Sequence, residues 1–390
     1  MKNNLNFLIH GYYGKKNTGD EAMLEIIIDK LKKIYPDCKI WITSNNLPNL
    51  KGRRNIFSAK EFCFNHRITL RTEWKIFQKI AKMDIIIYGG GTFLQDYGVK
   101  WTNMFVRLIR TLMAKILKKR IIAIGAGASN IETFLGKLFC RWIVKLTDIT
   151  VLRDIDSMNL LLKLGVPKTK MALSVDLTFL RNDFINYKKR SELATKNPIK
   201  IGVSILPFYN AILKNQKKSE RFIKELSANF DLILNKFNAK LYFISMKGGT
   251  EKNDYKFGKL LINEMSNSKK VVLFKYRDKP KETLNLVQKM DFAIGMRLHF
   301  VIFCFLANIP CIAISYNSKV KSFMKSIKMA QWCINEPLSI KNNALYNLFN
   351  KMTQSKVLYP ARNNRIKEFH AIAEKNFILL EELIKNDKNV

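Results

Sequence analysis

The sequence predicts an α/β protein with two Rossmann-like domains, each built on a parallel sheet. Three observations lead to this prediction. Apolar runs of strand length alternate with helical patterns along the chain, as in parallel sheets that are buried on both faces. Glycine-rich or charged turns follow several of these runs, at the strand ends where open α/β sheets bind ligands. The length of 390 residues is also sufficient for two domains.

The net charge is the outlier in the composition. The chain has 68 Lys and Arg residues against 31 Asp and Glu, a formal net charge of +37. Such a surface favours anionic partners: nucleic acid, an anionic membrane face or phosphorylated substrates. However, the basic residues are spread over the whole length, as they would also be in a proteome biased toward Lys and Asn. Charge alone therefore does not predict a nucleic-acid-binding protein.

The cysteines and histidines predict neither disulfides nor a metal site. None of the six cysteines belongs to a CxxC pair, and most lie in apolar runs, as expected of reduced side chains in the cytosol. None of the four histidines has the spacing of a zinc ligand. The N-terminal apolar run is too short for a signal peptide, and residues 300–316 fall short of the ~20 residues of a membrane span. We therefore expect a cytoplasmic protein.

A glycine-rich segment follows the first expected strand, at residues 5–10. It reads GYYGKKNTGDEAML, and Thr18 and Glu21 fit a capping box that opens a helix. A glycine-rich loop between a strand and a helix N-terminus is an anion-binding arrangement, although this one is neither a Walker A loop nor GxGxxG. The alternative is a tight turn that merely needs glycine.

A second glycine-rich segment, GGGTFLQD at residues 89–96, follows an expected strand at 84–88. Because three consecutive glycines are costly in any regular element, we expect a loop that a ligand or another backbone approaches closely. Gln95 and Asp96 end this loop. Their side chains suit two roles equally well: hydrogen bonds to sugar hydroxyls, or a cap for the next helix.

Arg153 follows an expected strand at residues 150–152. It suits anion binding, and its alternative is a salt bridge to Asp154 or Asp156. The next helix is expected to begin at Asp156 or Ser157. The other elements expected in this half are strands at 39–43 and 120–125 and helices at 74–80 and 100–118.

A polar, charged stretch from Asp176 to Pro198 is interpreted as the linker between the domains. A second series of alternating elements follows it. The expected strands are 200–205, 240–245, 270–274, 291–294 and 311–315, and the expected helices are 219–237, 255–265, 281–290, 298–307, 320–328 and 340–352. A charged helix is expected to run from beyond Pro360 to about Ile384.

Three polar side chains stand in the most apolar part of this half: Arg297, His299 and Lys319. The first two lie where a strand hands over to a helix, and Lys319 follows the next strand. A fork-shaped cation beside a proton donor suits a ligand with carboxylate or phosphate groups. The alternatives are that Arg297 pairs with an acid at a domain surface and that His299 is a satisfied interior histidine.

The two series imply two Rossmann-like domains that face one another across a cleft, the architecture of GT-B glycosyltransferases. We expect an N-terminal domain at residues 1–185, a linker at 186–198 and a C-terminal domain at 199–355. The C-terminal helix, within 356–390, is expected to cross back onto the first domain.

Taken in order, several segments resemble the polysaccharide pyruvyltransferase family. They are residues 11–24, 89–96, 153–157, the loop at Asp254, 295–299 and 316–319. The resemblance implies transfer of a pyruvyl group from phosphoenolpyruvate to two hydroxyls of a sugar in a cell-surface glycan or its lipid-linked precursor, with release of phosphate and no cofactor. Two positions depart from the family pattern: Leu206 replaces an arginine that relatives tend to have, and Asn130 replaces a frequent proline.

With this reaction, Arg297, Arg153 and Lys319 are expected to hold the phosphoenolpyruvate, next to Gly295. His299 is expected to act as the general acid. The residues expected to face the acceptor sugar are Gly14, Asn17, Gly19, Asp20, Glu21, Gly89, Gly90, Gly91, Gln95 and Asp96.

Acceptors of this family are commonly carried on lipid diphosphate, so the basic surface is expected to make peripheral contact with an anionic membrane. Nucleic acid is not expected as a partner. Two other functions remain open. One is a GT-B glycosyltransferase that places Arg297 and Lys319 on the diphosphate of a nucleotide-sugar. The other is a basic, non-catalytic protein that binds nucleic acid or acidic glycan.

Overall fold

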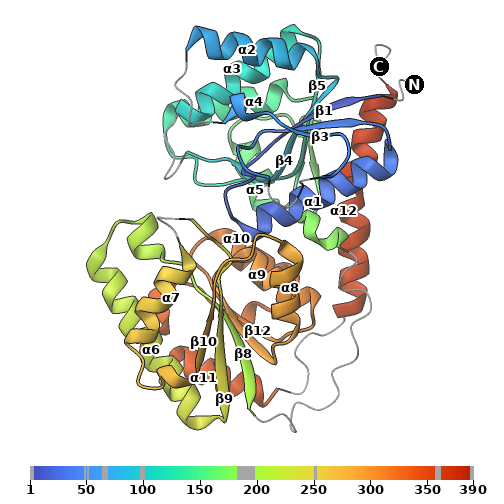
Figure 1. Ribbon diagram of the computed structural model, residues 1–390. Helices are drawn as coiled ribbons and strands as arrows, with labels where there is room; N and C mark the ends of the chain where they lie inside the picture. Colours follow the sequence, from blue (N-terminus) through green and yellow to red (C-terminus); the bar gives the residue numbers. More distant parts are fainter. Residues whose placement is uncertain are drawn as a thin grey trace. The chain divides into compact units, whose positions relative to one another are not determined.

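The computed structural model describes residues 4–47, 50, 52–63, 69–96, 102–181, 198–249, 253–355 and 362–386. The chain forms two compact units. The first comprises Met1–Lys15, Asp20–Arg181 and Glu368–Val390, and the second comprises Lys16–Gly19 and Asn182–Lys367. Each unit is built on one parallel sheet (Figure 1), which confirms the predicted α/β class. Apart from Pro198, the linker expected at 186–198 lies outside the described residues.

The sheet of the first unit has seven parallel strands in the order β3-β2-β1-β4-β5-β6-β7. They are β1 Asn6–His10, β2 Lys39–Ile42, β3 Ile56–Ser58, β4 Ile85–Leu94, β5 Arg120–Ala128, β6 Ile149–Leu152 and β7 Met171–Leu173. The direction of strand addition reverses between β1 and β4, which pair directly. Such a switch point is where open α/β sheets bind ligands.

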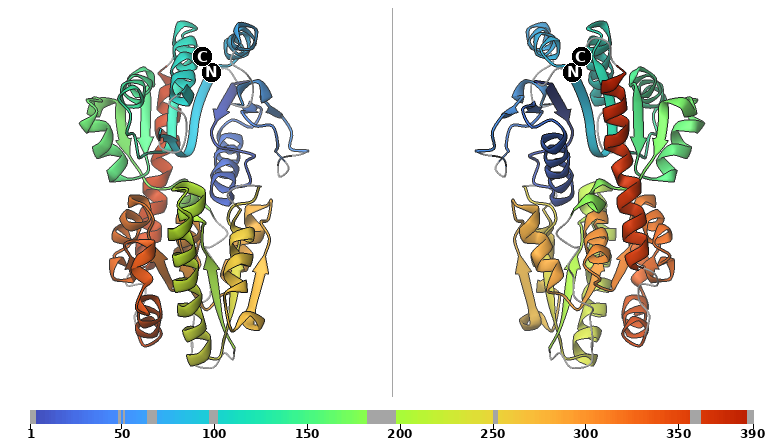
Figure 2. Two further views of the ribbon diagram at one scale, coloured as in Figure 1. Left: turned by 90° about the vertical axis from the view of Figure 1, so that its left-hand side faces the viewer. Right: turned by 90° about the vertical axis from the view of Figure 1, so that its right-hand side faces the viewer.

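Four helices share an apolar core with one face of this sheet. They are α2 Leu70–Ala81, α3 Thr102–Ile116, α4 Phe134–Leu146 and α5 Ile155–Lys163. Two further helices of this unit are α1 (Thr18–Ile34) and α12 (Arg362–Lys385), drawn in blue and red in Figure 2. Lys30 of α1 pairs with Glu374 of α12. Asn376 of α12 accepts a 2.8 Å hydrogen bond from the backbone N–H of Gly125 in β5.

The sheet of the second unit has six parallel strands in the order β10-β9-β8-β11-β12-β13. They are β8 Ile199–Ser204, β9 Ala239–Ile244, β10 Val271–Phe274, β11 Phe292–Gly295, β12 Cys311–Ile314 and β13 Cys333–Ile334. Its helices are α6 Gln216–Lys236, α7 Asp254–Asn263, α8 Pro280–Gln288, α9 Leu298–Leu306, α10 Ser318–Ser326 and α11 Ala344–Thr353. The switch point lies between β8 and β11. Among the described helices, none is long and apolar enough to cross a bilayer.

The prediction of a loop at residues 89–96 was wrong, because β4 continues as a strand to Leu94. Within it Gly91 pairs with Ala126 of β5. A Cβ atom on Gly89 would lie 2.5 Å from the hydroxyl of Tyr13, and one on Gly91 would lie 2.8 Å from a carboxylate oxygen of Asp20. The glycines therefore let the strand pass close to side chains of the first strand-to-helix connection.

Candidate functional site

Arg297 and His299 lie at the carboxyl end of β11, beside the switch point of the second sheet. The strand ends at Gly295, and Arg297 is the N-cap residue of α9. Glycine is needed at the strand end because a Cβ atom on Gly295 would lie 2.6 Å from a ring carbon of Phe300. Phe300, like the rest of α9 up to Leu306, is buried. The two polar side chains are thus carried by a helix that is anchored in the core.

The buried carboxylate of Asp254 orients Arg297. Nη2 of Arg297 lies 2.5 Å from Oδ1 of Asp254, whose side chain is 3% exposed against 20% for the arginine. Oδ2 accepts 3.0 Å hydrogen bonds from the N–H groups of Met246 and Lys247. Burial raises the pKa of Asp254, although Arg297 and these N–H groups act to lower it. The acid-pair alternative is therefore observed, with a buried partner. The pair holds the guanidinium in one orientation, which suits two-point binding of an anion.

The segment Lys16–Gly19 belongs to the second unit through its backbone. Asn17 forms an antiparallel bridge with Lys247 in the connection after β9. On either side of this bridge, the N–H of Thr18 donates to the carbonyl of Met246 at 3.0 Å, and the N–H of Gly248 donates to the carbonyl of Lys16 at 2.9 Å. Part of the glycine-rich segment is thereby attached to the connection that also binds the Asp254 carboxylate.

The capping box predicted for Thr18 and Glu21 was wrong. The N–H of Thr18 donates to the carbonyl of Met246 at 3.0 Å, and its hydroxyl has no hydrogen-bond partner among the residues that the structure describes. The carboxylate of Glu21 instead accepts a 2.7 Å hydrogen bond from the N–H of Gly14. Tertiary contacts thus take the groups that a local capping box would use.

Gly19 lies against the imidazole of His299. A Cβ atom on Gly19 would lie 1.9 Å from Nδ1 and 2.2 Å from Cγ of that ring. His299 is half-buried, and its ring also contacts Phe303, with 6.3 Å between ring centroids. The structure therefore brings together a residue predicted to bind the acceptor and one predicted to act on the donor.

Two further positions named from the sequence lie in the second unit: Lys319, a predicted donor-binding residue, and Leu206, a departure from the family pattern. Lys319 is half-buried in the first turn of α10, so this helix begins two residues earlier than expected. Leu206 follows β8 and is 2% exposed, so it is an apolar core side chain. In the first unit, Asn130 has φ 51°. Proline is excluded there because its ring fixes φ near −65°.

The carboxyl group of Glu21, one of the predicted acceptor-binding residues, has a strongly raised pKa. Its pKa is raised to about 7, chiefly by burial and in part by the neighbouring Asp20, whereas the N–H of Gly14 acts to lower it. Gly14 itself has φ +67°, and a Cβ atom there would lie 2.0 Å from the carbonyl oxygen of Asn46. A carboxyl group that titrates near neutral pH is suited to proton transfer. Sequence patterns contain no signal for this shift, since it arises from burial.

Asp96 binds the residues that precede α4. Its carboxylate accepts hydrogen bonds of 2.8 and 2.9 Å from the N–H groups of Glu132 and Thr133 and one of 2.7 Å from the Thr133 hydroxyl. Burial acts to raise the pKa of Asp96, but these hydrogen bonds outweigh it and lower the pKa. The carboxylate thus holds the two residues that precede α4, whose N-cap is Thr133, and a cap for the next helix, α3, stays a prediction. Gln95 is half-buried beside it.

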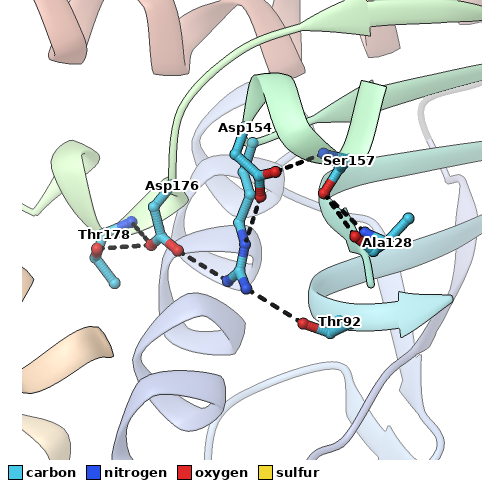
Figure 3. Close-up of polar contacts among 7 residues, drawn as sticks. Thr92, Ala128, Asp154, Ser157, Asp176 and Thr178 are labelled. Atoms are coloured by element: carbon cyan, nitrogen blue, oxygen red, sulfur yellow. Dashed lines mark hydrogen bonds and ion pairs between the residues drawn. The ribbon is translucent and has the colours of Figure 1, made fainter. Parts of the chain in front are cut away.

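Arg153 lies in a buried ion-pair cluster. Its Nη1 is 3.1 Å from Oδ2 of Asp176, and its Nε is 3.7 Å from Oδ2 of Asp154 (Figure 3). Nη2 donates to the hydroxyl of Thr92 at 3.3 Å. The salt-bridge alternative is therefore observed, and two carboxylates already neutralise the cation. A phosphate or carboxylate ligand would have to displace Asp176.

Asp154 and Asp176 of this cluster lie in elements that differ from the predicted ones. Asp154 is the N-cap of α5 and accepts a 2.7 Å hydrogen bond from Ser157 N–H, so the helix begins before Asp156. Asp176 precedes a buried 3₁₀ turn, Leu177–Leu180, in a stretch interpreted as linker. The interpretation was wrong for these residues because one short apolar turn carries no periodicity.

The sequence matches the family "Polysaccharide pyruvyl transferase" over residues 17–318. The chain belongs to this family. The match confirms the resemblance in the sequence analysis and makes the protein a transferase of polysaccharide biosynthesis. A comparison with curated proteins finds no match.

Solved structures show that this pyruvyl transferase family member has a GT-B-type fold. A glycosyltransferase from Rickettsia africae has a TM-score of 0.64 at 14% identity, over 99% of this chain and 100% of its own. The UDP-GlcNAc 2-epimerase of Methanocaldococcus jannaschii has a TM-score of 0.63 at 13% identity, over 97% and 99%. Anabaena HepE, solved with UDP and glucose, has a TM-score of 0.60 at 12% identity, over 98% and 100%.

Proposed function

We propose that this protein transfers a pyruvyl group from phosphoenolpyruvate to two hydroxyls of a sugar, in a cell-surface glycan or its lipid-linked precursor. Family membership supports the reaction class. The observation that carries the donor assignment is the Arg297 guanidinium, which Asp254 orients beside His299 at the switch point of the second sheet.

Phosphoenolpyruvate carries a carboxylate and a phosphate, the two groups that a guanidinium binds in two-point geometry. Arg297 is therefore the principal donor-binding residue of the proposal. Lys319 adds positive charge in the first turn of α10, where the helix dipole also favours an anion. A donor-binding role for Arg153 stays a prediction, and it requires exchange of Asp176 for the ligand.

The reaction needs one proton on the methylene carbon of the enol phosphate. His299 is proposed to deliver it, since imidazole exchanges protons near neutral pH. The cationic carbon that results is attacked by one hydroxyl, its bond to the phosphate oxygen breaks, and the second hydroxyl closes the ketal. The hydroxyls release two protons in total, one for the new methyl group and one for the phosphate.

The acceptor side of the proposal rests on the polar residues Asn17, Asp20, Glu21 and Gln95. The other residues predicted for this role have structural tasks that the contacts explain. Glycine at 14 and at 89–91 makes room for neighbouring atoms, and Asp96 binds the N–H groups of Glu132 and Thr133 just before α4. An acceptor could still contact the backbone of these residues.

The direct test is phosphate release from phosphoenolpyruvate by the purified protein with a panel of lipid-linked and synthetic glycosides. We expect release that depends on an acceptor and is abolished in Arg297→Ala. Arg277→Ala is the matched control, because Arg277 lies in the same unit but pairs with Glu282 at the surface. If phosphoenolpyruvate neither binds nor raises the melting temperature, it is not the donor.

A nucleotide-sugar donor is the second candidate. Structures of similar fold were solved with UDP and glucose or with UDP-GlcNAc and UDP. A donor screen by thermal shift separates the candidates, because each ligand stabilises only a protein that binds it. Stabilisation by nucleotide-sugars and not by phosphoenolpyruvate would favour the glycosyltransferase. Binding of neither donor, with salt-sensitive binding of acidic polymers, would favour the non-catalytic alternative.

A further inference from the structure

Helices α3 and α4 expose large apolar side chains on the side that faces away from the sheet. The exposed fractions are 79% for Phe134, 73% for Ile116 and 49% for Trp142. The two helices lie side by side (Figure 1), with 5.5 Å between the ring centroids of Phe105 and Phe139. We call this surface the α3–α4 face. Its apolar members are Phe105, Leu112 and Ile116 of α3 and Phe134, Leu135, Leu138 and Trp142 of α4.

The outward side of α4 does not follow the pattern of an ordinary surface helix. Its inward side, with Cys140, Ile143 and Val144, belongs to the core of the first unit. The opposite side of such a helix is normally polar. Here Phe134, Leu138 and Trp142 recur every four residues and form an exposed ridge. Contiguous exposed apolar surface of this kind marks an interaction site.

The charged side chains of helices α3 and α4 are all basic. Neither α3 nor α4 contains an Asp or Glu residue. Lys137, Arg141 and Lys145 also recur every four residues, so they form a basic row along the ridge. The ammonium group of Lys145 lies 5.5 Å from the centre of the Trp142 ring. Aromatic and aliphatic side chains beside a row of cations complement a surface that is anionic outside and apolar beneath.

We propose that the α3–α4 face docks on an anionic lipid bilayer. Tryptophan and phenylalanine are favoured at the level of the lipid headgroups, and Leu and Ile side chains reach the acyl chains just below. Each Lys or Arg near an anionic leaflet strengthens binding about fivefold. The basic row alone therefore contributes roughly a hundredfold, and the ridge adds a component that salt does not screen.

A second copy of the chain is a poorer occupant. In a symmetric dimer the same surface meets itself, so each basic row would come close to another basic row. Such like-charge contacts oppose association. A bilayer offers anionic headgroups to the row and acyl chains to the ridge.

The test is co-sedimentation of the full-length protein with vesicles of phosphatidylglycerol and phosphatidylcholine, compared with phosphatidylcholine alone. We expect binding to the anionic vesicles, part of which persists at 0.5 M salt. Lys137→Gln/Arg141→Gln should weaken it about 25-fold, at about fivefold for each residue. Phe134→Ser/Trp142→Ser should remove the part that resists salt.

Helix α7 of the second unit offers matched controls. Leu260 is 53% exposed there, and Lys256 and Lys259 are exposed beside it. Leu260→Ser and Lys256→Gln/Lys259→Gln should leave vesicle binding unchanged. Melting temperatures check that every variant folds, and all of these side chains are at the surface.

The proposal is wrong if the wild-type protein does not sediment with anionic vesicles, or if the α7 variants lose binding as strongly as the α3–α4 variants. It is also wrong if Phe134→Ser/Trp142→Ser leaves vesicle binding intact while it converts a dimer to a monomer in analytical ultracentrifugation, because the ridge would then serve a second copy. Vesicle binding requires no turnover. Its outcome is therefore independent of whether phosphoenolpyruvate is the donor.

Discussion

Replacing Gly19 by alanine tests how the first strand-to-helix connection supports His299. The new Cβ atom would lie 1.9 Å from Nδ1, 2.2 Å from Cγ and 2.5 Å from Cε1 of the imidazole. Non-bonded heavy atoms are stable at about 3.5 Å, so the ring has to move by roughly 1.5 Å. The backbone at Gly19 is not in the left-handed region, which means that alanine itself is tolerated there.

The expected effect on turnover exceeds the effect on stability. A displacement of about 1 Å at a reacting group costs roughly 100-fold in rate. For folding, the overpacking costs about 1–3 kcal/mol, and alanine in a helix returns up to about 1 kcal/mol relative to glycine. We therefore expect Gly19→Ala to lose at least about 100-fold in turnover and no more than about 3 kcal/mol in the free energy of unfolding.

Phosphate release measures the turnover, and urea unfolding measures the free energy of unfolding. The matched control is Gly258→Ala in α7, where the new Cβ atom would lie 2.8 Å from Cδ1 of Leu273, the movable end of a side chain. In a His299→Ala background, Gly19→Ala should cause little further loss, because the ring that it displaces is absent. Near-wild-type turnover of Gly19→Ala, or an equal loss in the His299→Ala background, would refute the reasoning.

Three further predictions follow from buried ionisable groups. The pKa of Glu21 is about 7 in the folded state against 4.5 for the free side chain, so the folded state holds this proton more tightly than the unfolded chain does. The stability that this proton contributes is therefore lost as pH rises from about 4.5 through 7. The free energy of unfolding should fall by up to about 3 kcal/mol, and Glu21→Gln should show a smaller fall in urea unfolding at pH 4.5 and 7.5. Asp254→Asn should cost about 3–5 kcal/mol, because Arg297 loses its buried partner, and should raise the KM for phosphoenolpyruvate at least tenfold; unchanged kinetics would contradict the orienting role. Arg153→Met leaves Asp154 and Asp176 without their cation and should cost about 3–5 kcal/mol, and a variant as stable as wild type in urea unfolding would count against this cluster.

Local patterns were sufficient for the architecture. Strands such as β1 and β12 and helices such as α9 were predicted within one or two residues, because apolar periodicity and turn residues act over a few neighbours. Arg297 and His299 were placed correctly at the carboxyl end of a strand for the same reason. In a parallel sheet, that position by itself indicates the edge where ligands bind.

The tertiary structure decided which groups meet. Arg153 is paired chiefly with Asp176, although the nearer Asp154 and Asp156 were the partners considered from sequence. Gly19 contacts His299, a residue distant in the chain. Such contacts depend on how separate elements pack, and no periodicity or spacing encodes them.

The sequence by itself determined the α/β class with two parallel sheets and the family, because these depend on local hydrophobic pattern and on motifs in order. Only the tertiary structure decided that the glycines of β4 make room for Tyr13 and Asp20 and that Glu21 titrates near neutral pH. The physical reason is that steric room and desolvation are set by every atom that surrounds a group. Those atoms come from segments that lie far apart along the chain.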